Sequence, residues 1–369
     1  MSLKTRRRYS MWGSDYSSQE VRVFAANTND PSMIKVFAEG RDLYSEVASM
    51  VYKVPYDQCT EFYKGELNLE GKKRRTNCKS LVLGLQYGRG IRSIAEQIKS
   101  HPGSVTKDDV NEAKKLSDDF FHHYPKAKEW MEGNYKKARE IGYVEDLWGR
   151  RRRLPDASLP KYQFSLMSGD TQKVNPLIGT SNKKLEPTKE QIARYTAKLD
   201  QARSKEGRDI VTKEAEKEGI KINCNSGFIA QAERQAINAP IQGGSATMSK
   251  IALRNISNDE LLKKLDCHPL IPVHDEIIGE APLWNINEVR DRVEEIMVHA
   301  GEPECKVPMK CDCISFDYWY QDQAEAHIKK DYLKLLDEGK TKDQAFAELL
   351  ANEYSEFSPE VITKVINEI

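Results

Sequence analysis

The stretch "IPVHDEIIGE", residues 271–280, places two adjacent acids inside an otherwise apolar run. Ile271 and Val273 precede the His-Asp-Glu triplet, and Ile277 and Ile278 follow it. Two β-branched runs separated by polar residues predict a β-hairpin. A carboxylate removed from water is costly unless a cation or hydrogen-bond donors compensate it. The tip of this hairpin is therefore either a solvated turn or a site at which a cation binds.

A second acid occurs in a similar setting near the N-terminus. Asp15 lies near the end of the strand-like segment "YSMWGSDYS", residues 9–17. Alone it is typical of an ordinary turn acid. Asp275 occurs in a similar setting, and two carboxylates on adjacent strands could bind two Mg²⁺ ions, a pair that stabilises in-line phosphoryl transfer. Mg²⁺ prefers one or two carboxylates completed by substrate phosphates.

A third segment, residues 72–90, is predicted to be a helix that ends at glycines. Four residues spaced four apart share one face of it: Arg75, Lys79, Leu83 and Tyr87. The two cations suit phosphates and the other two suit a base or sugar, so this face predicts a nucleotide site. Gly84 and Gly88 favour that interpretation because they leave room for a ligand beside the backbone. The alternative is an amphipathic helix with a basic end.

The bulk composition excludes several classes of protein. With 39% hydrophobic and 31% charged residues, the chain is typical of a charge-rich globular protein. No apolar run reaches the ~18 residues of a membrane span, and no apolar core follows the basic N-terminus as in a signal peptide. Seven cysteines without a regular framework indicate reduced thiols in a cytoplasm. The spacing of Cys305, Cys311 and Cys313 matches no common zinc site.

The distribution of charge says more than its sum, which is zero. Compact basic clusters occur at residues 4–8, 71–75 and 149–153. A single cluster is usually solvated surface. Three clusters beside glycine-bearing or aromatic segments favour contact with phosphates.

The order of the predicted elements indicates an α+β protein. Helices are expected at residues 42–54, 107–141 with a break near Pro125, 228–256, 286–300 and beyond 321. Residues 143–156 predict a hairpin with a basic turn. The charged segment 157–222 has few large apolar residues and predicts a solvent-exposed helical insertion.

These segments, in this order, resemble the conserved motifs of the family A DNA polymerases, the bacterial DNA polymerase I type. "DYSSQEVR" resembles the first motif, DYSQIELR. "RRTNCKSLVLGLQYG" resembles the second, R-x3-K-x3-F-G-x2-YG, and "PVHDEIIGE" resembles the third, which begins VHDE. "ERQAINAPIQGGSATMSKIAL" (233–253) and "WGRRRRLPD" (148–156) are similar to two further family segments.

The resemblance implies a two-metal centre. Asp15 and Asp275 ligate two Mg²⁺ ions, together with the main-chain carbonyl of Tyr16. Glu276 is a nearby acid of less importance.

It also implies a site for an incoming dNTP. Arg75 and Lys79 bind its triphosphate, and Lys79 is a candidate acid for the leaving pyrophosphate. Glu20, helped by Tyr87, excludes the ribose 2′-hydroxyl. Tyr44 replaces a histidine that contacts phosphate in the family.

For primer–template DNA, the resemblance implies minor-groove contacts near the primer end by four residues: Arg234, Asn238, Gln242 and His274. Such contacts read features that all correct base pairs share. Two departures from the family pattern lie elsewhere: Leu83 stands where an aromatic residue is usual, and Ser18-Gln19 stand where Gln-Ile is usual.

The resemblance predicts a palm with an antiparallel sheet, assigned to residues 1–39 and 223–320, and helical fingers at 40–222. Extra helices occupy 321–369. Because the first motif begins at residue 15, we expect no thumb and no 3′–5′ exonuclease domain, and therefore a separate chain that supplies them. This arrangement suggests a phage origin. The predicted function is template-directed DNA synthesis from dNTPs in a bacterial cytoplasm; the alternatives are a non-catalytic nucleic-acid-binding subunit and a related RNA polymerase.

Overall fold

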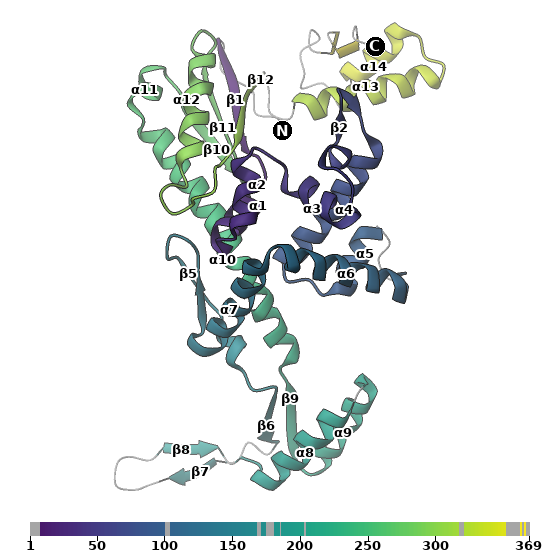
Figure 1. The fold of residues 1–369 in the computed structure, drawn as a ribbon, viewed down its shortest axis with the longest axis vertical. Coiled ribbons are helices and arrows are strands. Elements are labelled where there is room, and N and C mark those ends of the chain that lie inside the picture. The colour runs from purple at the N-terminus through teal and green to yellow at the C-terminus, as the bar shows by residue number, and fades with distance from the viewer. Residues whose placement is uncertain are drawn as a thin grey trace. The chain divides into compact units, whose positions relative to one another are not determined.

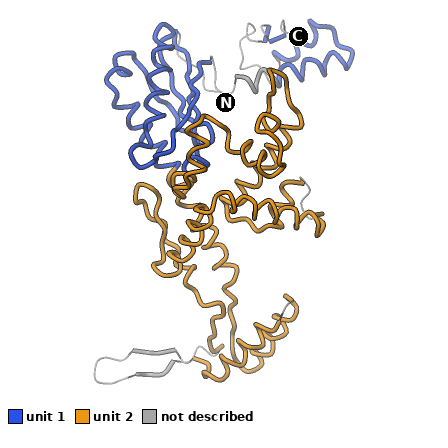
Figure 2. Tube along the Cα trace, viewed as in Figure 1, with its two compact units in different colours: residues 1–23, 245–369 blue, residues 24–244 orange. Residues whose placement is uncertain are grey.

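The structure is a computed structural model that describes residues 8–99, 104–167, 171–174, 181–184, 186–202, 204–316, 321–351, 362–363 and 365–366. The chain divides into two compact units, shown in Figure 2. Unit 1 comprises residues 1–23 and 245–369, and unit 2 comprises residues 24–244. Residues 24–39 and 223–244, which the sequence grouped with a palm, thus belong to unit 2. The assignment of palm and fingers stays a prediction.

Unit 1 is built on one four-stranded antiparallel sheet, labelled in Figure 1, with the strand order β10-β11-β1-β12. The strands are β1 (Tyr9–Tyr16), β10 (His268–Val273), β11 (Glu276–Pro282) and β12 (Cys311–Phe316). Its helices are α11 (Glu260–Lys264), α12 (Ile286–His299), α13 (Gln321–Asp337) and α14 (Lys342–Ala351). Helices α1 (Gln19–Thr28) and α10 (Ser226–Asn258) begin in one unit and end in the other.

Strand β1 is central because β11 and β12 pair with its two edges. It is buried from Ser10 to Ser14 and again at Tyr16, and the position of Asp15 is exposed. Gly279 of β11 allows this packing, since a Cβ there would lie 2.2 Å from the Trp12 ring. The sheet therefore presents Asp15 at the end of a strand that its two neighbours hold rigidly.

Unit 2 is mainly helical. Its first part contains α2 (Pro31–Ala38), α3 (Leu43–Tyr52), the short 3-10 helix Tyr56–Cys59, the hairpin β2 (Phe62–Tyr63) and β3 (Glu66–Leu67), α4 (Leu69–Gln86), α5 (Ile91–Lys99), α6 (Lys107–His123) and α7 (Pro125–Ile141). The hairpin β4 (Tyr143–Glu145) and β5 (Arg151–Arg153) follows, with a 3-10 helix at Pro155–Ser158. The predicted break near Pro125 and the predicted basic hairpin are both confirmed.

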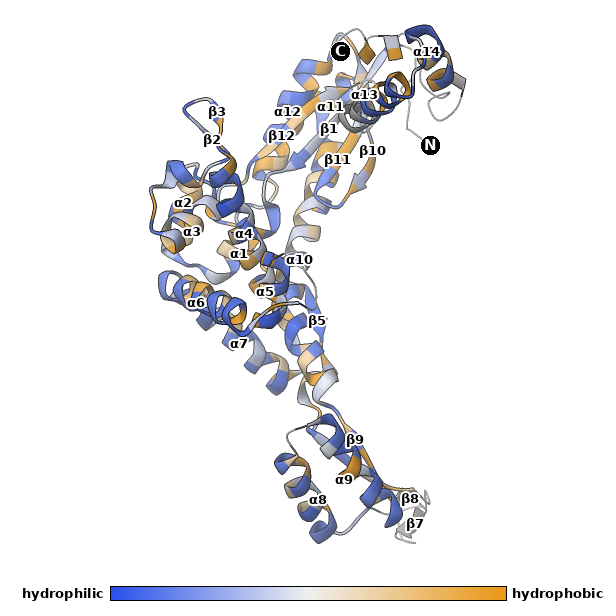
Figure 3. Ribbon diagram, turned by 90° about the vertical axis from the view of Figure 1, so that its right-hand side faces the viewer, coloured by the Kyte–Doolittle hydropathy of each residue, from blue (hydrophilic) through white to orange (hydrophobic). Residues whose placement is uncertain are grey.

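The insertion at residues 157–222 differs from the prediction. Helices α8 (Lys189–Gln201) and α9 (Lys205–Lys217) are present and largely hydrophilic, as Figure 3 shows. The helices of the predicted insertion are therefore confirmed. Strands β6 (Tyr162–Leu166), β7 (Thr171–Val174), β8 (Ser181–Lys184) and β9 (Ile220–Cys224) are also present and were not predicted. β6 pairs with β9, and a core forms from Tyr195, Leu199, Ala215, Ile220 and Ile222.

The C-terminal helices also have a core of their own. Its buried members all lie between residues 328 and 365: Ile328, Tyr332, Ala345, Leu349, Ile362 and Val365. The amphipathic helices expected beyond residue 321 are therefore confirmed over the described residues. No helix in the described part of the chain is long and apolar enough to cross a membrane. All seven cysteines lie in described residues and are free.

Candidate functional site

Three carboxylates form a row across adjacent strands of the unit 1 sheet. Asp15 of β1 pairs with Glu276 of β11 on one side and with Asp312 of β12 on the other. Directly opposed residues of antiparallel strands project from the same face of a sheet, with Cβ atoms about 4.5–5.5 Å apart. Three negative charges therefore occupy neighbouring positions on one face.

A tight turn adds a fourth carboxylate. His274 and Asp275 form the two-residue connection between β10 and β11, whose last pair is Val273 with Glu276. His274 has φ +55°, the left-handed conformation that short hairpin turns require at this position. The amide of Tyr16 donates to the carbonyl of Asp275 at 3.3 Å, which joins the turn to the end of β1. The fold thus brings together the two acids that the sequence predicted as a pair.

The electrostatics of this cluster are unfavourable in isolation. Partial removal from water, followed by the charges of Asp275, Glu276 and Asp312, raises the pKa of Asp15 from 3.8 to about 6. Like charges opposite one another on a sheet are destabilising. A bound cation would remove this repulsion.

The acidic row presents only oxygen donors, the kind that Mg²⁺ prefers. Within the described part of the chain, no three His, Cys, Asp or Glu side chains already converge as a metal site. Mg²⁺ does not need such a cage, since it commonly takes one or two carboxylates and completes its shell with water and substrate phosphates. The oxygen-only donors and the unfavourable charge of the row therefore fit Mg²⁺ that binds together with a phosphate-bearing substrate.

Tyr16, a predicted ligand, and Glu276, the predicted lesser acid, both differ from Asp15 and Asp275. An ideal Cβ on Gly13 would lie 2.9 Å from Oε1 of Glu276, so this carboxyl leans along the sheet over the glycine. The Tyr16 side chain is buried, and its hydroxyl donates to the carbonyl of Met297 at 2.8 Å. Any contact of Tyr16 with a metal must therefore use its main chain, as the resemblance implies.

Glu20 lies in the first turn of α1, just after a sharp elbow in the chain. Ser18 has φ +57° at this elbow. The Arg22 guanidinium donates from Nε to the carbonyl of Ser17 at 2.9 Å and from Nη1 to that of Pro308 at 2.5 Å. Buried Gln19 donates to Oγ of Ser249 at 3.1 Å. These bonds hold Glu20 and the Asp15 row in one unit.

In unit 2, the predicted phosphate-binding residues of α4 lie together around one aromatic ring. Arg75 donates from Nε and Nη2 to the two oxygens of Asp42, at 3.0 and 3.1 Å. The Arg75 guanidinium carbon and Nζ of Lys79 lie 5.4 and 5.9 Å from the centre of the Tyr44 ring. Leu83 and Tyr87 are half-buried farther along the helix. The four-residue spacing thus yields the expected single face.

The two glycines of this helix have a different role from the one predicted. A Cβ on Gly84 would lie 2.8 Å from the Ile94 side chain, so this glycine permits α4 to pack on α5. Gly88 has φ +61°, and a Cβ there would lie 3.1 Å from Cγ of Arg234. Both positions are filled by protein, so the prediction that they leave room for a ligand was wrong.

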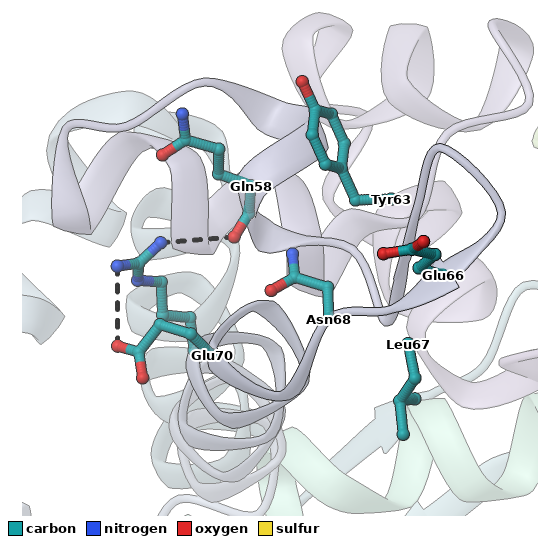
Figure 4. Close-up of a pocket in the computed structure, with 7 residues that line it drawn as sticks. Gln58, Tyr63, Glu66, Leu67, Asn68 and Glu70 are labelled. Atoms are coloured by element: carbon teal, nitrogen blue, oxygen red, sulfur yellow. Dashed lines mark hydrogen bonds and ion pairs between the residues drawn. The ribbon is translucent and has the colours of Figure 1, made fainter.

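A pocket of about 460 Å³ lies beside the β2–β3 hairpin, at the start of α4 (Figure 4). Its lining includes Arg74, which donates to the carbonyl of Gln58 at 3.2 Å and forms an ion pair with Glu70 at 3.4 Å. Arg75 and Lys79 do not line it. Adjacent arginines of α4 therefore face different surroundings.

The predicted DNA-contacting residues of α10 also lie in unit 2 and share one helix face. Arg234 and Gln242 are exposed, and Asn238 is half-buried between them. The carbonyl oxygen of the Asn238 side chain is buried without a hydrogen-bond partner among the described residues. A buried acceptor of this kind is costly unless a ligand supplies a donor.

The predicted residues thus form two sets. Unit 1 brings together Asp15, Tyr16, Glu20, His274, Asp275 and Glu276, and unit 2 holds Tyr44, Arg75, Lys79, Leu83, Tyr87, Arg234, Asn238 and Gln242. Two residues were missed. Asp312 had no local signal, because only strand pairing places it beside Asp15. Asp42 did have a local sequence signal, because it begins the D-x-Y segment that ends at Tyr44.

Comparison with known proteins places the chain in a family. The sequence profile of DNA polymerase family A matches residues 3–321, most of the chain. The chain belongs to DNA polymerase family A. The predicted α+β fold and the resemblance are thereby confirmed.

Its relatives include DNA polymerase I of Lactococcus lactis subsp. lactis (strain IL1403), 28% identical over 308 residues that cover 84% of this chain and 26% of that protein. The thermostable DNA polymerase I of Thermus aquaticus is 25% identical over 283 residues, 77% of this chain and 24% of that protein. This family A chain therefore spans about a quarter of the length of these relatives.

A solved structure shares the fold. It is the POL domain of Pol1 from M. smegmatis in complex with DNA primer-template and dNTP. The TM-score is 0.57 at 24% sequence identity, and the match covers 86% of this chain and 41% of that one.

Proposed function

We propose that this chain is the palm-and-fingers core of a template-directed DNA polymerase, which adds dNTPs to the 3′ end of a primer. The observation that carries the proposal is the acidic row of Asp15 with its neighbours, in a chain that matches the family over residues 3–321. The sheet of unit 1 corresponds to the palm and the helices around α4 to the fingers. The setting is a bacterial cytoplasm, and a phage gene is its predicted source.

Asp15, Asp275 and the Tyr16 carbonyl would hold two Mg²⁺ ions. Bound Mg²⁺ supplies positive charge to the oxygens that become more negative during phosphoryl transfer. The turn bond between Tyr16 and Asp275 keeps the two acids at a constant separation. Such positioning supports catalysis because much of the barrier to phosphoryl transfer is one of alignment and charge.

The remaining residues bind and select the reactants. Arg75 and Lys79 hold the triphosphate, and Lys79 donates a proton to the leaving pyrophosphate. Glu20 and Tyr87 exclude a ribose 2′-hydroxyl, and Leu83 contacts the sugar and base of the dNTP. Four further residues contact the primer–template near the primer end: Arg234, Asn238, Gln242 and His274.

A primer-extension assay with Mg²⁺ and dNTPs tests the proposal. We expect the Asp275→Ala variant to lose incorporation by at least about a hundredfold, because it removes half of the acidic pair. Thermal unfolding of the variant should match that of the unaltered chain. The matched control is Asp291→Asn, which removes an exposed carboxylate from α12 and should leave incorporation unchanged. Full activity of Asp275→Ala would refute the two-metal assignment.

The assay also separates the alternatives. Binding of primer–template without incorporation, alone or with a chain that supplies a thumb, would indicate the non-catalytic subunit. Equal use of rNTPs and dNTPs would contradict the role of Glu20 and favour an RNA polymerase.

A further inference from the structure

One aromatic ring in unit 2 contacts both cations of the proposed triphosphate site. The Tyr44 side chain is 4% exposed, and the Arg75 guanidinium and the Lys79 ammonium lie over it at 5.4 and 5.9 Å. These distances are within the ~6 Å over which an aromatic face attracts a cation. A ring so deeply buried is poorly placed to bind phosphate in place of a histidine.

The two cations need such support. Arg75 and Lys79 lie four residues apart on α4, where like charges repel one another. Asp42 compensates Arg75 through its two oxygens. Among the described residues, no carboxylate forms an ion pair with Lys79, so the Tyr44 ring is the stabilising contact that the structure gives its ammonium group.

Asp42 and Tyr44 are themselves held firmly by α3. Asp42 caps this helix by accepting from the amide of Ser45 at 2.8 Å, and its own amide donates to the hydroxyl of Tyr56 at 2.9 Å. Because Arg75 uses Nε and one hydrogen of Nη2 for Asp42, three of its five N–H groups remain directed elsewhere. The guanidinium is thus fixed by Asp42 and still able to donate, and the ammonium of the exposed Lys79 is able to donate from beside the Tyr44 ring.

We propose that Tyr44 is a positioning residue: its ring holds Arg75 and Lys79 side by side as a preformed grip for the polyphosphate of a nucleotide. This inference rests on the proposed function, because that function supplies the nucleotide. The phosphates contact the two cations, and the ring acts through them. A chain of two or three phosphates engages both cations at once, whereas a monophosphate engages one.

Equilibrium binding to the full chain tests this without requiring catalysis, with dATP, inorganic tripolyphosphate and dAMP as probes in the presence of Mg²⁺. Loss of the cation–π contacts of one ring corresponds to a dissociation constant that is roughly three- to tenfold larger. We expect Tyr44→Leu to weaken the binding of dATP and of tripolyphosphate by that factor, and the binding of dAMP by less than twofold. Tyr44→Phe keeps the ring and should stay within twofold of the unaltered chain.

The matched control is a second tyrosine of α3. The Tyr52 ring lies 6.0 Å from the Arg74 guanidinium carbon, and Arg74 faces the pocket of Figure 4. Tyr52→Leu removes a similar cation–π contact from the same pair of helices, and should leave all three affinities unchanged. An equal loss in Tyr52→Leu would mean that both variants act by loosening α3 and would overturn the inference.

Thermal unfolding shows whether each variant is folded. If Tyr44→Leu does not fold, Tyr44→Met fills similar space without a π-face and carries the same expectation. Unchanged tripolyphosphate affinity in a folded variant without the ring, or the same loss in Tyr44→Phe as in Tyr44→Leu, refutes a positioning role. If the proposed polymerase fails in primer extension but these affinities change as expected, the fault lies in the function and not in the grip.

Discussion

At the scale of single residues, the carboxyl of Asp15 is destabilised by neighbouring carboxylates when no cation is bound. Its carboxyl is opposed by Glu276 and Asp312 and adjoins Asp275, and its pKa lies near 6 instead of 3.8. Between about pH 4 and pH 6 the unfolded chain releases the Asp15 proton while the folded chain retains it. The stability of the metal-free protein should therefore fall as pH rises through this window and stay lower above it.

We expect Asp15→Asn to abolish this pH-dependent loss. At pH 7.5, without metal, the variant should be more stable than the unaltered chain by roughly 1 kcal/mol, a value reduced by solvent screening of the carboxylate. The measurement is thermal unfolding from pH 4.5 to 8, with and without Mg²⁺, compared as the difference between the two proteins. Parallel curves in the metal-free series, or equal stabilisation of both by Mg²⁺, would contradict the assignment.

Several residues of this centre were predictable from short motifs. Asp275 follows from an acid set between apolar strands, and Asp15 from the strand that ends beside it. Asp312 was not predictable, because nothing in "KCDCISF" separates a site residue from an exposed strand residue. Its role depends on the pairing of β12 with a strand almost 300 positions earlier, which is a property of the sheet.

At the scale of elements, the row across β11, β1 and β12 predicts a contribution from Asp312 to cation binding. Removing its charge should lessen the repulsion on the sheet and also weaken attraction for Mg²⁺. We expect Asp312→Asn to raise the Mg²⁺ concentration needed for half-maximal thermal stabilisation by about two- to fivefold, corresponding to 0.4–1 kcal/mol. Asp291→Asn on α12 serves as the control of equal charge and should leave the titration unchanged. A Mg²⁺ titration of Asp312→Asn that superimposes on the unaltered chain would remove Asp312 from the site.

The helices and strands show why local sequence patterns predict only part of the fold. Helix α4 was predictable from its spacing, but the reason for Gly84 was not, since it depends on contact with Ile94 of α5. Within the insertion, the charged helices were evident from the sequence. Strands β6 and β9 have only five residues each, and they pair with one another across more than fifty positions of the chain. A strand of that length carries too little periodicity to be separated from a loop.

At the scale of the whole molecule, two segments of the described chain each have a buried apolar cluster of their own. One is the insertion, with its cluster around Tyr195, and the other is formed by the C-terminal helices. The sequence could predict that extra helices follow residue 321. It could not predict that these helices form a core of their own, because that depends on which residues pack together in three dimensions. The family profile ends at the same point, residue 321.

This coincidence predicts that the C-terminal helices can be removed. A chain that ends at residue 321 lacks the described apolar cluster that contains Ile328 and Tyr332. All four strands of the unit 1 sheet lie before residue 317, so the sheet should keep its fold. We expect its primer–template affinity and its Mg²⁺ stabilisation to stay within twofold of the full chain. Ile328→Asp is the full-length control, because a buried charge should unfold the module alone. Hydrogen exchange would then rise from residue 327 onward and remain unchanged in β1 and β11. Faster exchange in those strands, in either variant, would show that the helices stabilise the sheet and are not a separate module.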